Sequence, residues 1–245
     1  MLLLVRHGLS QANYCQWLLD DGGLGFYGLT EPVEDDWHRK LLNLNPERDP
    51  GLMPLGAEQA KEGGRFLVKW LFEQNLSLGA VAVSPFKRTI QTASYMLAET
   101  EYAGKVILDP LAREIYAGSE FDQGSPRSQV MRLIESGSLF NPDRFDVSAL
   151  DQEIWFSEKL ETYKGTEERA DTFLKKYAEI IISAKDVLLC VSHAGIIRKI
   201  TGYVKDIMNC DIIVYDPEGP GKRIFRPSYE TRHQCLPGAP EELML

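Results

Sequence analysis

Short runs of apolar residues recur along the chain, and each run ends at polar or turn-forming residues. Apolar runs of this length, bounded by turn signals, predict strands that are buried on both faces. The runs lie at 2–5 (LLLV), 79–83 (GAVAV), 105–108 (KVIL), 186–191 (DVLLCV) and 211–215 (DIIVY). We expect the last of them to be an edge strand.

Segments with a helical pattern separate several of these runs. In 56–74 the apolar residues are spaced so that they share one face of a helix. Ser84 and Thr166 are the predicted N-caps, Pro85 suits the first position of a helix, and Gly63 with Gly64 weakens another helix. The predicted helices cover 56–74, 84–98, 166–184 and about 194–203.

Strands that alternate with helices predict an α/β fold. Short apolar strands of this kind form a mostly parallel sheet whose two faces are covered by helices. We therefore predict a three-layer α/β/α sandwich formed by one domain over 1–245, because 245 residues, 44% of them apolar, can bury one large core. Residues 13–55 are predicted to be a long insertion and the tail from about 217 to be irregular, while 129–165 show no clear period.

The charge of the chain restricts its partners. A net charge of -9 and a pI of about 5.1 make the protein a poor general binder of nucleic acid or of an anionic membrane surface. We therefore expect neither as a partner. Long-range steering does not help an anionic substrate to reach such a protein, so capture requires a local positive pocket.

The cysteines and the lengths of the apolar runs indicate the cellular compartment of the protein. The four cysteines form no C-x-x-C pair, so neither a zinc ribbon nor a thioredoxin-like site is indicated, and a reducing compartment is the default. The N-terminal apolar run is too short for a signal peptide, and no run approaches the length of a membrane span. We expect a cytoplasmic protein.

The ends of the predicted strands carry the residues that can do chemistry. In open α/β sheets, ligands bind beyond the carboxyl ends of the strands. Two of the four histidines fall at such ends, and each is followed closely by a glycine that allows close approach of a ligand to the backbone. The polar residues at these ends are Arg6, His7, Ser84, Arg88, Arg113, Glu114, Ser192 and His193.

These residue types suit phosphoryl transfer. Arginine offers a planar fork that matches phosphate oxygens, and phosphoryl transfer needs mainly positioning and charge stabilisation. No Asp/His cluster has metal-ligand spacing, so neither a metal nor another cofactor is expected. A neutral histidine can attack phosphorus to form a phosphohistidine. Glu114 is the expected proton donor to the leaving alkoxide, if its environment raises its pKa.

Five segments resemble, in family order, the motifs of the histidine phosphatase superfamily, whose fold is phosphoglycerate-mutase-like. The motif R-H-G alone would be a weak signal, but the ordered set spans most of the chain. The segments are LLLVRHGLSQAN at 2–13, MPLGAEQA at 53–60, SPFKRTIQTA at 84–93, LAREIYAG at 111–118 and VSHAGIIR at 191–198.

The resemblance implies a role for each matching position. It implies that His7 is the phosphorylated nucleophile and that Glu114 is the acid and base of the reaction. The positions that it assigns to the phosphate pocket are Arg6, Arg88 and His193, with Asn13 assisting and with Ser192 and the Ala194 backbone as further contacts.

The segment after Glu114 departs from the mutases of this superfamily. Cofactor-dependent phosphoglycerate mutases carry a longer segment there, with tyrosine and arginine that grip a carboxylated substrate, whereas this chain reads IYAGSEFDQGSPRSQV. The stretches FDQGSP, FDVSAL and TGYVKDIMNCDIIVY resemble a branch of fungal and plant mutase-like proteins. We therefore expect a metal-independent phosphatase that acts on a small phosphorylated metabolite.

Two other functions stay open at this point. A phosphoglycerate or phosphosugar mutase would use the same phosphohistidine but would rephosphorylate a bound product before water arrived. A non-catalytic module would capture phosphorylated ligands, although a pure binder needs no proton donor. The aromatic residues Trp17, Phe26, Tyr27 and Trp37 of the insertion could line a substrate mouth or pack the insertion onto the body.

Overall fold

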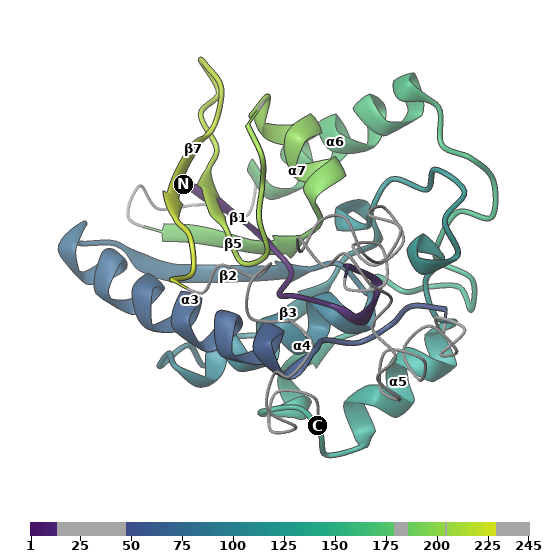
Figure 1. Ribbon diagram of the computed structural model, residues 1–245, viewed down its shortest axis with the longest axis horizontal. Coiled ribbons are helices and arrows are strands. Elements are labelled where there is room, and N and C mark those ends of the chain that lie inside the picture. Colours follow the sequence, from purple (N-terminus) through teal and green to yellow (C-terminus); the bar gives the residue numbers. More distant parts are fainter. Residues whose placement is uncertain (14–47, 179–185, 204, 229–245) are drawn as a thin grey trace, which may run out of the picture.

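A computed structural model describes residues 1–13, 48–178, 186–203 and 205–228, so most of the predicted insertion lies outside the described residues, with Trp17, Phe26, Tyr27 and Trp37. The described strands form a seven-stranded sheet in the order β4-β3-β2-β5-β1-β6-β7 (Figure 1). The five strands from β4 to β1 are parallel to one another, whereas β6 is antiparallel to both of its neighbours, β1 and β7. The strands are β1 Leu2–Arg6, β2 Ser77–Val83, β3 Val106–Leu108, β4 Phe145–Asp146, β5 Asp186–Ser192, β6 Ile212–Val214 and β7 Lys222–Phe225.

Helices cover both faces of this sheet (Figure 1). Side chains alternate along the central strand β5: Leu189 and Val191 join the apolar core under α3 and α4, while Leu188 and Cys190 join the core under α6 and α7. The predicted three-layer α/β/α class is thereby confirmed. The helices are α3 Pro54–Glu73, α4 Lys87–Ala98, α5 Arg127–Glu135, α6 Tyr163–Ala178 and α7 Ala194–Thr201.

The side of the sheet beyond β6 differs from the prediction. The run at 211–215 was expected at an edge and the tail from 217 was expected to be irregular, but Lys222–Phe225 form β7 and pair with β6. Both expectations are therefore wrong here. The segment KRIF carries little apolar signal of its own, and it becomes a strand because β6 offers it backbone hydrogen bonds.

The predicted N-cap of α4 is also wrong. The helix begins at Lys87, whose backbone N–H donates at 2.9 Å to the buried carboxylate of Asp49, a residue far away in the sequence. The hydroxyl of Ser84 lies instead 2.8 Å from Nε2 of His193. Tertiary contact thus supplies the cap and frees the local hydroxyl for the histidine.

Helix α6 begins one turn before the predicted N-cap. It starts at Tyr163, and the hydroxyl of Thr162 accepts from the N–H of Gly165 at 3.1 Å. Thr166 is already inside the helix, where its hydroxyl donates to the Thr162 carbonyl at 3.0 Å. Thr162 has the same side-chain chemistry as Thr166, so the local sequence did not distinguish the two.

The two adjacent glycines of α3 are expected to respond oppositely to alanine. A Cβ at Gly63 would make ordinary contacts of 3.5 Å with Met96 and Phe225, whereas a Cβ at Gly64 would collide with the Met96 carbonyl oxygen and lie 3.0 Å from the Glu99 side chain. Gly63→Ala should therefore stabilise the protein by about 0.5–1 kcal/mol through helix propensity. Gly64→Ala should destabilise it by about 1–3 kcal/mol through overpacking.

Denaturant unfolding of the two variants measures this difference, and each variant serves as the control for the other. Equal effects of the two substitutions would contradict the close packing of α3 against α4 at Gly64.

Candidate active site

The carboxyl ends of β1 and β5 bring two histidines together. Arg6 and Ser192 end these parallel strands in register with each other, so the residues that follow them are neighbours. The ring centroids of His7 and His193 lie 5.2 Å apart at an interplanar angle of 63°, and both side chains are buried. The backbone N–H of His7 donates to the Ser192 carbonyl at 2.9 Å, which joins the two strand ends.

One nitrogen of His7 is available for chemistry. Nδ1 lies 2.8 Å from the carbonyl oxygen of Gly8, and because a carbonyl can only accept, Nδ1 must carry the ring proton. The lone pair of the neutral ring is then on Nε2. Burial lowers the pKa of His7 well below its ordinary value, and the positive charges of Arg88 and Arg6 lower this pKa further. The ring is therefore neutral at neutral pH.

His193 is held in the opposite tautomer. Nη2 of Arg88 lies 3.3 Å from Nδ1 of His193, and because a guanidinium can only donate, Nδ1 accepts. Nε2 then carries the proton and donates to the Ser84 hydroxyl at 2.8 Å. Burial lowers the pKa of His193 well below its ordinary value, and Arg88 and His7 add to this lowering.

Two arginines supply positive charge beside these histidines. The buried Arg88 donates to the Phe121 carbonyl at 2.9 Å and pairs with Asp122 at 2.9 Å. Arg6 donates to the Ile207 carbonyl at 2.7 Å, while its buried Nε finds no acceptor among the described residues. Burial lowers the pKa of Arg6 to about 10, so this guanidinium remains charged at neutral pH.

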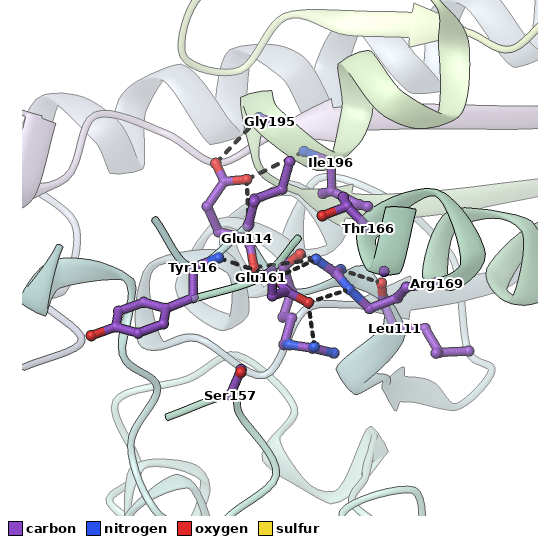
Figure 2. Close-up of polar contacts among 12 residues, drawn as sticks. Leu111, Glu114, Tyr116, Ser157, Glu161, Thr166, Arg169, Gly195 and Ile196 are labelled. Carbon is purple, nitrogen blue, oxygen red and sulfur yellow. Dashed lines mark hydrogen bonds and ion pairs between the residues drawn. The ribbon is translucent and has the colours of Figure 1, made fainter. Parts of the chain in front are cut away.

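Glu114 lies at the N-terminus of α7 (Figure 2). Its carboxylate accepts from the backbone N–H groups of Gly195 and Ile196, each at 3.2 Å, and from Ile115 at 2.8 Å. The amino end of a helix favours an anionic group, because its first N–H groups have no partner within the helix. Ala194, the first residue of α7, thus belongs to the turn that faces Glu114.

The environment of Glu114 raises its pKa, as the role of a proton donor requires. Burial raises the pKa of this carboxyl group and the nearby charge of Asp122 raises it further, against the opposing effects of the backbone N–H groups and Arg88. The position also depends on Gly195, because a Cβ there would collide with a carboxylate oxygen and lie 3.2 Å from Cδ of Glu114.

Two predicted phosphate contacts are already engaged with protein groups. Oδ1 of Asn13 accepts from the Ser10 hydroxyl at 3.1 Å and from Nδ2 of Asn209 at 2.9 Å. The hydroxyl of Ser192 donates to the Ala112 carbonyl at 2.7 Å, in the segment that leads to Glu114. A hydroxyl has one proton, so this geometry does not favour Ser192 as a donor to phosphate.

Three buried side chains around the His7 loop received no role from the sequence. The N–H groups of Gly8 and Leu9 donate to Thr92 Oγ1 at 3.0 Å and to Gln59 Oε1 at 2.9 Å. Asn209 donates to the His7 carbonyl at 3.0 Å. Thr92 and Gln59 lie within the motif segments and could have been found there, whereas no local signal marks Asn209.

Two features are absent from residues 1–13, 48–178, 186–203 and 205–228, a metal-binding cluster and a membrane-spanning helix. No group of three or more His, Cys, Asp or Glu side chains in these residues is arranged to hold a metal ion. Among the described helices, none is both long and apolar enough to cross a membrane.

Three solved structures illustrate what the chain resembles. It matches an ecdysone phosphate phosphatase from Bombix mori in complex with tungstate, at 16% identity over 94% of both chains, with a TM-score of 0.58. It also matches a phosphoserine phosphatase from Entamoeba histolytica at 17% identity, over 91% of this chain and 94% of that chain, with a TM-score of 0.45. A phosphoglycerate mutase from Thermus thermophilus matches at 17% identity, over 92% of this chain and 99% of that chain, with a TM-score of 0.43.

Comparison of the sequence with curated proteins and with family profiles gives a single family. No curated protein gives a significant match. The profile described as "Histidine phosphatase superfamily (branch 1)" matches residues 34–212, well over half of the chain. The matched range includes Arg88, Glu114 and His193, while Arg6 and His7 precede it.

Proposed function

Because the chain belongs to the histidine phosphatase superfamily, we propose that it is a metal-independent phosphomonoester hydrolase that forms a phosphohistidine at His7. The predicted membership of this superfamily is confirmed by the matching profile, and the superfamily contains both phosphatases and mutases. The observation that carries the proposal is the neutral, buried His7 with an unprotonated Nε2 beside two arginines. The proposed substrate is a small phosphorylated metabolite.

The first half of the proposed reaction transfers the phosphoryl group to the protein. The lone pair on Nε2 of His7 attacks phosphorus, and the bond from phosphorus to the ester oxygen breaks. Arg6, Arg88 and His193 are proposed to bind the phosphoryl oxygens, after Arg88 exchanges part of its present contacts for phosphate and the Nε2–H of His193 turns from the Ser84 hydroxyl to a phosphoryl oxygen. Glu114 gives its proton to the leaving alkoxide, so that an alcohol departs and a carboxylate remains.

The second half returns the protein to its starting state. Water attacks the phosphorus of the phosphohistidine while the Glu114 carboxylate takes one of its protons. The bond from phosphorus to nitrogen breaks, and its electron pair returns to Nε2 of His7. Inorganic phosphate is released with Glu114 protonated again, so the cycle needs no other reactant.

The pKa shifts give this cycle a pH dependence. The lowered pKa of His7 keeps the nucleophile neutral into the acidic range, so activity falls only when pH drops through that pKa. The raised pKa of Glu114 keeps the donor protonated above the ordinary range of a glutamate, and activity falls as pH rises through it. The proposed enzyme therefore loses activity on both sides of an optimum, and a pH–rate profile of kcat/KM measures the two limbs.

The segment after Glu114 favours hydrolysis over a phosphoglycerate mutase reaction. Residues 115–126 contain no lysine and no arginine, and they include Glu120 and Asp122. Within this segment the Tyr116 hydroxyl accepts from the side-chain amide of Gln123 at 2.8 Å. A carboxylated substrate would therefore find no cation to hold it between Glu114 and Arg127, the first residue of α5.

The proposal also includes the setting in which the protein works. Cys190 and Cys210 are free and buried, which fits a reducing cytoplasm. The acidic chain is proposed to act on a soluble phosphate ester, without nucleic acid or a membrane as partner.

A substrate screen tests the proposed function. The purified protein should release phosphate from 4-nitrophenyl phosphate without added metal and at an unchanged rate in EDTA. A panel of sugar phosphates, phosphoglycerates, nucleotides and phosphopeptides then identifies the preferred ester. Activity that EDTA removes and a divalent cation restores would contradict metal independence. Strong stimulation of isomerisation by a bisphosphorylated cofactor would favour the mutase, and phosphopeptide binding without turnover would favour a binding module.

A further inference from the structure

The segment that presents Glu114 is held by side chains rather than by regular secondary structure. The segment Leu111–Glu114 begins within the short 3-10 helix at Pro110–Ala112 and continues past its end, and each of its four carbonyl groups accepts a hydrogen bond from a side chain. The carbonyls are those of Leu111, at 2.9 Å from Arg169 Nη1; Ala112, at 2.7 Å from Ser192 Oγ; Arg113, at 2.8 Å from Arg169 Nη1; and Glu114, at 3.5 Å from Arg169 Nη2.

Arg169 makes three of these four contacts. It lies on α6, is 7% exposed, and reaches the loop with its guanidinium (Figure 2). A planar guanidinium has five N–H groups in fixed directions, so it can determine the relative orientation of several carbonyls at once. A lysine would offer a single point charge in the same place.

Glu161 holds this guanidinium in place. Its carboxylate accepts from Arg169 Nε at 3.1 Å and Nη2 at 2.8 Å, and also from Arg113 at 2.6 Å. It accepts from the Tyr116 N–H at 3.1 Å, while its own N–H donates to the Tyr116 carbonyl at 3.0 Å. The network therefore fixes the chain on both sides of Glu114.

Burial of Arg169 and Glu161 is not explained by stability alone. The side chains of Arg169 and Glu161 are 6% and 9% exposed, and buried ion pairs of this kind are often no more stabilising than apolar residues of the same volume. Directional hydrogen bonds to successive carbonyls do what apolar packing cannot, since they determine backbone orientation. That orientation directs the Glu114 carboxylate to the N-terminus of α7.

We propose that Arg169, held by Glu161, is the positioning residue that places the Glu114 carboxyl group for proton transfer to the leaving group. The inference rests on the proposed function, in which Glu114 is the proton donor. Loss of this positioning should affect substrates according to their leaving group. An alkoxide cannot depart without a proton, whereas a 4-nitrophenolate is stable enough to depart with little help.

The test compares benzyl phosphate with 4-nitrophenyl phosphate, which are similar in size and charge but differ in leaving group. Arg169→Gln should lower kcat/KM for benzyl phosphate roughly 100-fold, as expected for a displaced catalytic group, and should lower it much less for 4-nitrophenyl phosphate. Glu114→Gln should show the same selective loss. Arg144→Gln is the matched control, because Arg144 also donates to a backbone carbonyl, that of Tyr102, and it should leave the ratio unchanged.

Two milder variants keep the test decisive if Arg169→Gln does not fold. Arg169→Lys keeps the charge but loses the fork, and Ser192→Ala removes the single hydrogen bond to the Ala112 carbonyl. Both should change the substrate ratio in the same direction as Glu114→Gln. The positioning role would be overturned if kcat/KM fell equally for the two esters, or if it fell in neither Arg169→Lys nor Ser192→Ala. A wild-type protein that hydrolyses neither ester would instead overturn the proposed function, and the inference with it.

Discussion

Replacement of His7 by alanine is expected to lower the turnover of phosphate esters by about 10⁵-fold or more, because the variant lacks the atom that accepts the phosphoryl group. Arg6, Arg88 and His193 remain in this variant, so it should still bind an oxyanion such as tungstate or phosphate. Steady-state hydrolysis measures the loss, and titration calorimetry with tungstate measures the retained binding.

The nitrogen that becomes phosphorylated provides a second, independent measurement. Nδ1 of His7 donates to the Gly8 carbonyl, so attack must come from Nε2, and the trapped intermediate should carry phosphate on that nitrogen. NMR of rapidly quenched protein distinguishes the two isomers. An unchanged rate in His7→Ala would refute the assignment of the nucleophile, and phosphate on Nδ1 would refute the tautomer.

Gly195→Ala is expected to lower kcat for an alkyl phosphate by about 10²-fold or more while leaving the fold nearly as stable. The added methyl group would collide with the Glu114 carboxylate, which is the far end of a flexible side chain and can move away. The proton donor then loses its place at the N-terminus of α7, although Arg6, Arg88 and His7 are untouched. Hydrolysis of benzyl phosphate and thermal unfolding measure the two effects.

A double-mutant cycle distinguishes this explanation from general damage to α7. If Gly195→Ala acts through Glu114, then combining it with Glu114→Gln should lower activity no further than Glu114→Gln alone. Gly63→Ala is the control, because it adds the same methyl group to a helix where the contacts are ordinary. Additive losses in the double variant would show that Gly195 acts on something other than Glu114.

The sequence by itself determined the class of the fold and which residues lie together at the candidate site. Strands that are buried on both faces are nearly continuous apolar runs, so the runs at 2–5 and 186–191 were visible as strands without any partner. Ligands meet a parallel sheet at its carboxyl ends, so His7 and His193 could be placed together from strand ends alone.

Only the tertiary structure decided the features that depend on contacts between distant segments. The strand β7 exists because β6 pairs with it, and the cap of α4 comes from Asp49 rather than Ser84. The loop that carries Glu114 is oriented by Arg169, 55 residues away in the chain. Local sequence encodes burial and period, whereas a hydrogen bond across such a separation leaves no periodic signal, so the fold must form before it can be seen.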